Sequence, residues 1–581
     1  MQGCKRMKTI THQADFCVVG GGLAGMCAAI AAARKGIKTI LMHDRPVLGG
    51  NSSSEIRMWV CGAHGENNLE TGIIEEIRLE NLYRNNCPNF SIWDSILYEK
   101  VRFQENLVLL LNCSCNHAEM SGQRIKSITG WQLTTETFHT VESGLFADCS
   151  GDSILAPLTN AEFRMGREAG QEFGESIAPE VADRRTMGMS CLIQARETDS
   201  PQKFIPPAWA NKYLSDESFP HRGHTLEGSQ NFWWLEIGGE NDTIHDTETL
   251  RDELLKIAFG VWDHIKNHGG HSAENWLLEW VGFLPGKRES RRYAGDYIMT
   301  QNDVAACGKF DDIIAYGGWS MDDHHPQGLN YPGVPTIFHH APSPYGIPYR
   351  SLYSKNIDNL FFAGRNISVT HSAMSSTRVM ATCALLGQAV GTAAALAVKN
   401  DLSPRGVYQA KLQELQQDLM DDDAWLPGLR RTIPELSQRA ELKASSGDPE
   451  PLRNGMERPV DNNDNCWEGS TGDWVEYSFN RVEQISRIRI VFDSNLNRTP
   501  YNMVAKYPLQ MTHFSPPETL ISGFHIEAEN DSGKTIEIFR TGNNYQRLFR
   551  MQLPFAARRV RLYIDAVCGC GNKKIFSFDI K

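Results

Sequence analysis

The chain has 581 residues, of which 41% are hydrophobic and 22% are charged, and its formal net charge is −12. This length and apolar content predict two to four domains with several hydrophobic cores. The acidic balance, with no stripe of basic residues, excludes a protein that binds nucleic acid through its phosphate backbone.

A glycine motif near the start predicts a dinucleotide-binding site. The run Phe16–Val19 is apolar, GGGLAG follows at Gly20–Gly25, and the next residues, 26–33, are rich in alanine. Such a strand, turn and helix need Gly20 for the tight turn, Gly22 for approach of a pyrophosphate and Gly25 for helix packing. The helix N-terminus then faces the phosphates.

The second strand is expected at Lys38–Met42, and a carboxylate at its end should bind ribose hydroxyls. The usual carboxylate position holds His43, and Asp44 follows one residue later. Two alternatives remain open: Asp44 reaches the ribose from its shifted position, or the contact is made differently.

Four further segments carry a resemblance to a known family. RPVLGGN begins at Arg45, DCSGDSILA at Asp148, KRESRRYAGDY at Lys287, and NLFFAGRNISVTHSAMSSTRVMATCALLGQAVG at Asn359. With the glycine motif, they resemble bacterial FAD-dependent oxidoreductases of the glutathione-reductase-like and fumarate-reductase-like flavoprotein superfamily. The resemblance covers about residues 14–400 and implies FAD as the cofactor; the alternative is a Rossmann-like NAD enzyme with accidental matches.

The resemblance also implies which residues hold FAD. The expected cofactor-binding residues are Gly20, Gly22, Gly25, Asp44, Arg45, Gly49, Gly50, Asn51, Asp152, Gly364, Arg365 and Ser376. Residues 107–111 and 124–128 are expected to form the β-meander between the two halves of the FAD-binding domain. Phe361–Arg365 is expected to be the last sheet strand, with the next helix starting near Ser375–Thr377 and pointing at the flavin pyrimidine ring.

Residues 379–398 form a stretch of twenty residues without a charge, long enough to cross a bilayer. Alanine and glycine dominate it, and Thr382, Gln388 and Thr392 interrupt it. We therefore expect a buried helix packed on the sheet, and no membrane span.

The fold class is predicted as α/β, with a discontinuous Rossmann-like FAD-binding domain, an inserted α+β substrate domain and a C-terminal antiparallel β-sandwich. The expected boundaries are 1–160 and 301–400 for the FAD-binding domain, 161–300 for the substrate domain, 401–450 for a helical connector and 451–581 for the sandwich. In the substrate domain, an apolar face from Leu250 to Ile265 predicts a helix. Strands are expected at 187–195, 232–237 and 276–283.

Beyond residue 450, apolar residues alternate with polar ones, as in antiparallel strands. Val475, Tyr477 and Phe479 make one such set, and Phe576, Phe578 and Ile580 make another. The segments from Asn454 to Phe479 and at the C-terminus resemble a discoidin-like, galactose-binding-like jelly roll. Such a domain binds glycans or, equally, only buttresses the enzyme or forms an oligomer interface.

Of the fourteen cysteines, only Cys113/Cys115 and Cys568/Cys570 are closely spaced, and neither pair has zinc-finger spacing. No metal site is expected. Free thiols, and an N-terminus without an apolar signal segment, favour the cytoplasm, or the periplasm if a leader was removed.

The catalytic candidates are histidines near the flavin motifs, because oxidation of a CH–OH or CH–NH centre needs a base. His371 and His324 flank the last FAD strand, and His64 follows the RPVLGGN loop. Arg292 is the candidate proton donor of a fumarate-reductase-like ene-reductase. Cys61 is a candidate redox thiolate, and it or His64 is a candidate for covalent FAD attachment.

The leading hypothesis is an FAD-dependent oxidoreductase that takes a hydride from a carbohydrate-derived or polyol CH–OH group, with histidine as base. The alternatives are the ene-reductase, a redox-neutral glycan lyase or glycosidase, and a glycan-binding protein with a vestigial flavin fold. Because no second GxGxxG motif has strand and helix context, electrons are expected to pass to or from an external partner. Substrate identity and oligomeric state stay open.

Overall fold

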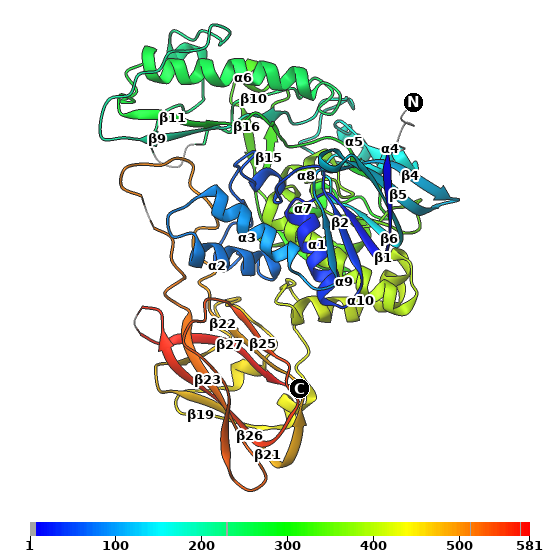
Figure 1. The fold of residues 1–581 in the computed structure, drawn as a ribbon, viewed down its shortest axis with the longest axis vertical. Helices are drawn as coiled ribbons and strands as arrows, with labels where there is room; N and C mark the ends of the chain where they lie inside the picture. Colours follow the sequence, from blue (N-terminus) through cyan, green and yellow to red (C-terminus); the bar gives the residue numbers. More distant parts are fainter. Residues whose placement is uncertain (1–6, 228–230, 512, 570) are drawn as a thin grey trace, which may run out of the picture. The chain divides into compact units, whose positions relative to one another are not determined.

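The structure is a computed structural model that describes residues 7–227, 231–511, 513–569 and 571–581. The chain forms two compact units. Unit 1 comprises Met1–His64, Cys87–Leu415 and Pro500–His513, and unit 2 comprises Gly65–Asn86, Gln416–Thr499 and Phe514–Lys581. Figure 1 labels their helices and strands.

A seven-stranded mixed sheet forms the centre of unit 1, with strand order β3-β2-β1-β6-β5-β4 and β18 paired with β6. β3, β2, β1, β6 and β18 run parallel, while β4, β5 and β6 form an antiparallel meander. The strands are β1 (Lys8–Val19), β2 (Thr39–Met42), β3 (Leu107–Leu110), β4 (Cys113–Ser121), β5 (Arg124–Gln132), β6 (Thr137–Asp148) and β18 (Leu360–Phe362). The prediction of residues 107–111 as part of the meander is therefore wrong. Leu107, Leu109 and Leu110 are buried, and the strand pairs in parallel with β2.

Two helices rich in small residues pack against each other beside this sheet, α1 (Leu23–Arg34) and α9 (Met380–Asn400). A Cβ added at Gly387 or Gly391 would lie 1.9 Å from the Ala24 carbonyl oxygen or 2.1 Å from that of Ala28. Only glycine permits this approach of two helix backbones. α9 is the one described helix long and apolar enough to cross a membrane, and 94% of that apolar window is buried inside the protein.

The segment between the two parts of this sheet contains α6 (Thr247–Asp263), whose apolar side is buried by short strands (Figure 1). A π-helical turn, η4 (His264–His268), continues it. The predicted strand at 232–237 is reduced to its last two residues, and the one at 187–195 is split in two. The strands here are β7 (Phe163–Arg164), β8 (Met189–Ser190), β9 (Ile193–Glu197), β10 (Glu236–Ile237), β11 (Trp276–Val281), β12 (Gly286–Lys287) and β13 (Arg292–Tyr293).

The remaining elements of unit 1 are short and connect these layers. The helices are α3 (Phe90–Arg102), α4 (Leu155–Thr159), α5 (Gly170–Phe173), α7 (Gln301–Ala305) and α8 (His371–Thr377), with 3-10 turns η1 (Gly50–Ser52), η2 (Leu133–Thr135), η3 (Asp216–Ser218), η5 (Gly328–Asn330) and η6 (Tyr349–Ser351). The strands are β14 (Ile313–Gly317), β15 (Met321–His324), β16 (Thr336–His339) and β17 (Tyr345–Pro348). α10 (Pro404–Asp421) follows α9 in the chain.

Unit 2 is built on two antiparallel sheets, of five strands in the order β19-β21-β26-β23-β24 and of four in the order β20-β27-β22-β25. Their alternating apolar residues make one core between the sheets, as in a β-sandwich. The strands are β19 (Glu441–Ala444), β20 (Trp467–Gly469), β21 (Trp474–Ile485), β22 (Ile488–Phe492), β23 (Ile521–Glu529), β24 (Thr535–Thr541), β25 (Leu548–Met551), β26 (Phe555–Val567) and β27 (Lys573–Ile580). Three helical segments accompany them: α2 (Ile73–Arg84), α11 (Glu435–Arg439) and η7 (Glu450–Arg453).

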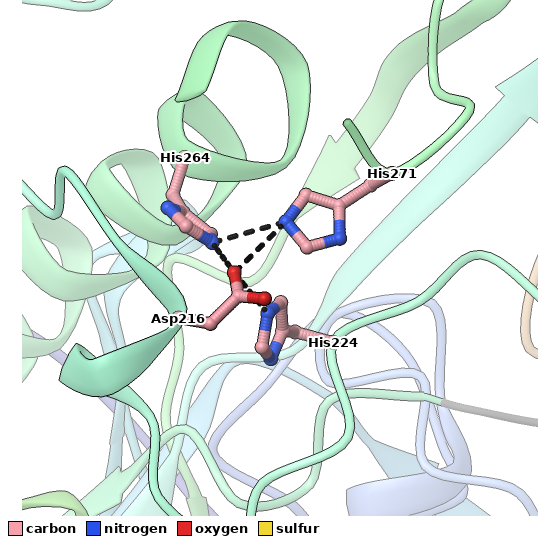
Figure 2. Close-up of side chains that lie close together, drawn as sticks. All are labelled: Asp216, His224, His264 and His271. Carbon is pink, nitrogen blue, oxygen red and sulfur yellow. Dashed lines mark hydrogen bonds and ion pairs between the residues drawn. The ribbon is translucent and has the colours of Figure 1, made fainter. Parts of the chain in front are cut away.

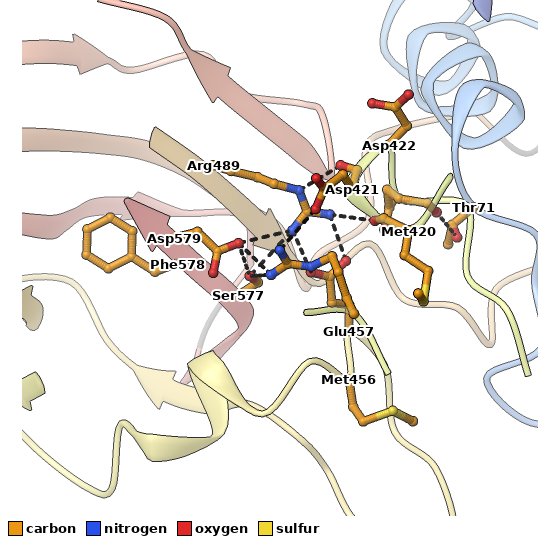
Figure 3. Close-up of polar contacts among 12 residues, drawn as sticks. Thr71, Met420, Asp421, Asp422, Met456, Glu457, Arg489, Ser577, Phe578 and Asp579 are labelled. Atoms are coloured by element: carbon orange, nitrogen blue, oxygen red, sulfur yellow. Dashed lines mark hydrogen bonds and ion pairs between the residues drawn. The ribbon is translucent and has the colours of Figure 1, made fainter. Parts of the chain in front are cut away.

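A buried network of charges lies at one side of the sandwich (Figure 3). Arg489 donates to Glu457 at 2.8 Å and lies 3.6 Å from Asp579, while Arg431 donates to Glu457 at 2.8 Å. Burial alone would raise the pKa of Glu457, but the two guanidinium groups hold it at about 2. Each charge in this network therefore depends on its partners for compensation.

Candidate active site

A cavity of about 330 Å³ in unit 1 is lined by the glycine motif and by residues of the inserted segment, among others. Gly20 has a φ of +102°, and a Cβ there would lie 2.5 Å from the backbone of Cys149. A Cβ at Gly25 would lie 1.8 Å from the Gly20 carbonyl oxygen. At Gly22, in contrast, the nearest atom would be 4.0 Å away, so the loop is packed behind and open toward the cavity.

His43 takes part in shaping this loop. Its Nδ1 accepts a hydrogen bond from the Gly21 amide at 3.0 Å, and its Nε2 lies 3.0 Å from the Val47 carbonyl oxygen. Asp44 lines the cavity with a side chain that is 56% exposed. The two residues after the second strand therefore have different roles. The His43 imidazole stabilises the glycine turn, and the Asp44 carboxylate lines the cavity, where a ribose is expected.

The cavity is rich in arginine nitrogens suited to an anionic ligand. Buried Arg45 Nη1, Arg365 Nε and Arg378 Nε have no hydrogen-bond partner among the described residues, and all three side chains line the cavity. Buried polar groups are normally paired, so these orphaned donors fit the phosphates and the flavin of a dinucleotide. The open face of Gly22 provides the matching close approach.

Asp152, Lys287 and Arg365 form an ion cluster in the cavity lining. Asp152 accepts from Lys287 Nζ at 2.8 Å and from Arg365 Nη2 at 2.8 Å. Burial opposes ionisation of this carboxyl, but the two cations lower the pKa of Asp152 to about 2. Asn51 donates to the Lys287 carbonyl at 3.1 Å. Asp152 therefore holds the side chains of Lys287 and Arg365 in place at the cavity.

Of the expected cofactor residues, most lie together in this cavity. Its lining includes Gly20, Gly22, Asp44, Arg45, Gly49, Gly50, Asn51, Asp152, Gly364 and Arg365. Gly25 lies behind the turn. Ser376 is placed elsewhere: it is fully buried, its hydroxyl lies 2.6 Å from that of Tyr345, and the cavity is lined by Arg378, Val379 and Met380 instead. The expectation that the helix start at Ser375–Thr377 points at the flavin is corrected, because Val379 breaks the segment and a new helix, α9, begins at Met380.

The inserted segment contributes Ser190, Trp233 and Arg288 to the cavity lining. Arg288 donates to the Ser190 hydroxyl at 2.9 Å and to the Trp233 carbonyl at 2.8 Å, and lies 3.4 Å from Glu236. These side chains are the candidates for contact with a substrate.

His324 lies beside this part of the lining. Its Nδ1 is 2.7 Å from Glu236 Oε2, and its ring packs edge-on against Trp233. Burial lowers the pKa of His324, while Glu236 opposes the shift. Burial would raise the pKa of Glu236, but Arg288 and His324 lower it to about 2. The pair therefore consists of a carboxylate and a neutral imidazole, and no described residue hydrogen-bonds to the imidazole Nε2.

His371, like His324, is not among the described residues that line the cavity, and its surroundings differ. Its Nδ1 is 2.8 Å from Glu289 and its Nε2 is 3.5 Å from Asp323. Burial would lower the pKa of His371, but these carboxylates raise it to about 9. An imidazolium at neutral pH has no lone pair to accept a proton, so the geometry favours His324 over His371 as base.

Arg292 does not reach the cavity either. It is fully buried, donates to Glu168 at 2.8 Å and to the carbonyl oxygens of Gly166 and Val369, and is paired with Glu289. The guanidinium of Arg292 is thus hydrogen-bonded to protein groups and does not face the cavity. The prediction that Arg292 is the proton donor of an ene-reductase is therefore corrected.

The two other candidates are divided between surface and cavity. His64 is exposed and its ring stacks on Trp319 at 4.3 Å. Cys61 is buried and lines the cavity near the start of α9, since the Ala381 amide donates to its carbonyl. Glu236, which sequence reasoning missed, had a signal: it is the one charged residue in the otherwise apolar segment Phe232–Ile237.

A Rossmann-like sheet with a glycine turn and an arginine-lined dinucleotide cavity defines a flavoprotein oxidoreductase. Residues 15–419 match the family model described as FAD dependent oxidoreductase, and the chain belongs to this family. The cofactor is accordingly FAD.

Similar proteins were found for parts of the chain. Glycerol-3-phosphate dehydrogenase of Mycobacterium leprae (strain TN) and glycerol-3-phosphate dehydrogenase 2 of Mycobacterium tuberculosis (strain ATCC 25618 / H37Rv) are each 36% identical over 70 residues. These residues are 12% of this chain and 12% of each relative, so the match spans about an eighth of their length.

Among solved structures, one similar chain is chitosan-binding module 1 from a chitosanase/glucanase of Paenibacillus sp. IK-5. It has 13% identity and a TM-score of 0.19, over 25% of this chain and 97% of that one. Another is the family 32 carbohydrate-binding module of Streptococcus pneumoniae EndoD. It has 11% identity and a TM-score of 0.20, over 26% of this chain and 97% of that one.

Proposed function

We propose that this flavoenzyme oxidises a CH–OH group of a carbohydrate-derived or polyol substrate, with His324 as the general base. The observation that carries the proposal is the buried His324–Glu236 pair, which contacts Trp233 and Arg288 of the cavity lining. A neutral imidazole held by a carboxylate is the arrangement that accepts a proton at neutral pH.

FAD, held by the glycine turn and the cavity arginines, would supply the hydride acceptor. The alcohol proton goes to His324 Nε2, Glu236 stabilises the imidazolium that forms, and the substrate carbon gains a carbonyl. Arg288 holds Trp233 and Ser190 in place through its two donated hydrogen bonds and adds positive charge beside the reacting oxygen. The substrate thus loses a hydride and a proton, which together are two electrons and two protons, and the electrons would leave to an external acceptor.

The substrate class has support from two directions. The partial relatives are named for glycerol 3-phosphate, a polyol phosphate. In the lining contributed by the inserted segment, an indole ring lies beside hydroxyl and guanidinium groups, a combination suited to the apolar face and hydroxyl edge of a sugar or polyol.

The test compares His324→Gln with His340→Gln, a matched change at an exposed histidine. With a substrate found by anaerobic flavin reduction, we expect His324→Gln to lower the rate of flavin reduction by about 10²–10⁴-fold. FAD content and the His340→Gln rate should stay as in the wild type. Equal rates of flavin reduction in both variants would show that His324 is not the base.

We also propose that the enzyme works in a reducing compartment, the cytoplasm. None of the twelve described cysteines forms a disulfide with another, which supports this assignment. Cell fractionation followed by immunodetection tests it, and recovery in a periplasmic or secreted fraction would contradict it.

A further inference from the structure

Four side chains of unit 1 outside the flavin cavity converge on one point: Asp216, His224, His264 and His271 (Figure 2). One atom of each lies within 4.8 Å of the corresponding atom of every other. Asp216 belongs to η3, His264 begins the π-helical turn η4, and the other two lie in the loops that follow. None of the four is among the described residues that line the cavity.

The distances match a small tetrahedral ion. Four ligand atoms about 2.0–2.1 Å from a tetrahedral Zn²⁺ lie about 3.3–3.4 Å apart. Asp216 Oδ1 is 3.3 Å from His224 Nε2, 2.9 Å from His264 Nε2 and 3.4 Å from His271 Nε2. His264 Nε2 and His271 Nε2 are 3.0 Å apart. These four distances are within a few tenths of an ångström of the tetrahedral spacing, and the two remaining distances, from His224 to the other rings, are at most 4.8 Å.

Two of the rings are oriented as metal ligands are. His224 Nδ1 is 2.8 Å from the Arg222 carbonyl oxygen, and His264 Nδ1 is 3.0 Å from that of Tyr213. Because a carbonyl only accepts, each Nδ1 carries the hydrogen, and Nε2 of the neutral ring presents a lone pair. Backbone carbonyls commonly fix the tautomer and orientation of metal-binding histidines in this way.

The lone pairs of these rings then need a cation. His264 Nε2 faces the Asp216 carboxylate at 2.9 Å, and both atoms are acceptors when the ring is neutral. His224 Nε2 faces the same oxygen. A single divalent ion at the common point satisfies all these lone pairs, whereas the alternative is an imidazolium hydrogen-bonded to Asp216.

We propose that Asp216, His224, His264 and His271 bind one Zn²⁺ ion with a structural role. Three imidazoles and one carboxylate suit zinc, and four protein ligands leave no open position for catalysis. The ion would join residues 216–224 to the end of α6 at 264–271. Three of the four side chains are largely buried, with exposed fractions of 0% for His264, 7% for His271 and 11% for His224.

The first experiment measures metal content in untagged holoenzyme by inductively coupled plasma mass spectrometry. The variants are His264→Ala, His271→Ala and, as a control, His245→Ala, whose ring is 72% exposed. We expect about one zinc per chain in the wild type and His245→Ala, and less than about a tenth of that in the two ligand variants. FAD content reports that each variant is folded.

Two further readouts do not depend on the variants. Cobalt(II) added to metal-free wild type should give the intense visible absorption of a tetrahedral site, and a chelator should lower the melting temperature of the zinc-loaded protein by roughly 5–10 °C. Wild type that retains no zinc after incubation and desalting, or ligand variants that retain it fully, would overturn the site. Zinc that binds without changing the melting temperature would overturn its structural role.

Discussion

Two histidines, His324 and His371, are both buried next to a glutamate, but their surroundings give them different charge states. The pKa of His324 is lowered, first by burial. His371 lies between two carboxylates, which raise its pKa to about 9 despite its burial. The difference in charge separates a candidate base from a structural imidazolium, although the sequence gives both histidines equal weight.

The lowered pKa of His324 predicts the pH dependence of turnover. A general base works only when deprotonated, so the rate falls as pH drops through its pKa. Because burial lowers that pKa below the ordinary value of about 6.5, we expect kcat/KM to stay on its plateau to below pH 6.5. The measurement is the pH profile of flavin reduction, with Glu236→Gln as comparison. A limb at or above pH 7 would contradict the assignment.

A substitution at Gly22 tests whether FAD binds at the glycine turn without disturbing the fold. Its φ of −66° suits alanine, and an added Cβ would have nothing within 4.0 Å, yet the residue lines the cavity. We expect Gly22→Ala to fold normally and to weaken FAD binding about tenfold or more, because the methyl group occupies the space of the pyrophosphate.

Equilibrium titration of the apoprotein with FAD measures this effect. Gly144→Ala is the matched control, because that glycine is exposed and its added Cβ would make only an ordinary 3.6 Å contact. Equal FAD affinity in both variants would show that the cofactor does not approach Gly22.

At this scale, the sequence predicted the cofactor cradle better than the catalytic groups. A turn fixed by Gly20 and Gly25 is a local property, so chain spacing is enough to find it. Glu236 meets His324, and Glu289 meets His371, only through the tertiary fold. The same is true of the proposed zinc ligands, which come from two loops about forty residues apart.

The helices α8 and α9, next to the flavin cavity, are separated by a break at Val379. The sequence predicts the helix start near Ser375–Thr377, but Val379 is extended, with φ −66° and ψ 146°, and α9 begins after it. Alternation and helical periodicity carry no signal for such a break. The result is that Arg378, rather than Ser376, lies at the cavity.

The packing of α1 on α9 predicts a sharp sensitivity at Gly391. Its added Cβ would lie 2.1 Å from the Ala28 carbonyl oxygen, so Gly391→Ala forces two buried helices apart. We expect a loss of roughly 1–3 kcal/mol in the free energy of unfolding of unit 1. Chemical denaturation followed by flavin fluorescence measures it, with Lys399→Ala at the exposed end of α9 as control. A neutral Gly391→Ala would contradict the close packing.

For the whole molecule, the sequence predicted the α/β body and the C-terminal sandwich, because the period of the apolar residues changes between them. It assigned residues 65–86 to the FAD-binding part, whereas they belong to the compact unit of the sandwich. The association of α2 with residues more than 300 positions later is non-local, and no periodicity within α2 encodes it.

The buried charges of unit 2 predict that a substitution among them lowers the stability of unit 2 without loss of FAD. Arg489→Met leaves Glu457 and Asp579 buried without one of their cations, so we expect unit 2 to lose about 3 kcal/mol of stability while FAD stays bound. Differential scanning calorimetry with flavin absorbance separates the two effects. Arg481→Ala, at a side chain that is 76% exposed, should change neither, and an unchanged melting curve in Arg489→Met would contradict the account.

We propose that FAD in this cavity accepts a hydride from a polyol or sugar alcohol. The anaerobic visible spectrum of the purified holoenzyme, before and after addition of sugars, glycosides, uronates and polyol phosphates, tests this. We expect an oxidised flavin spectrum that bleaches with at least one of them, and that bleaches far more slowly in His324→Gln. A flavin that stays oxidised with every compound in the panel would contradict it.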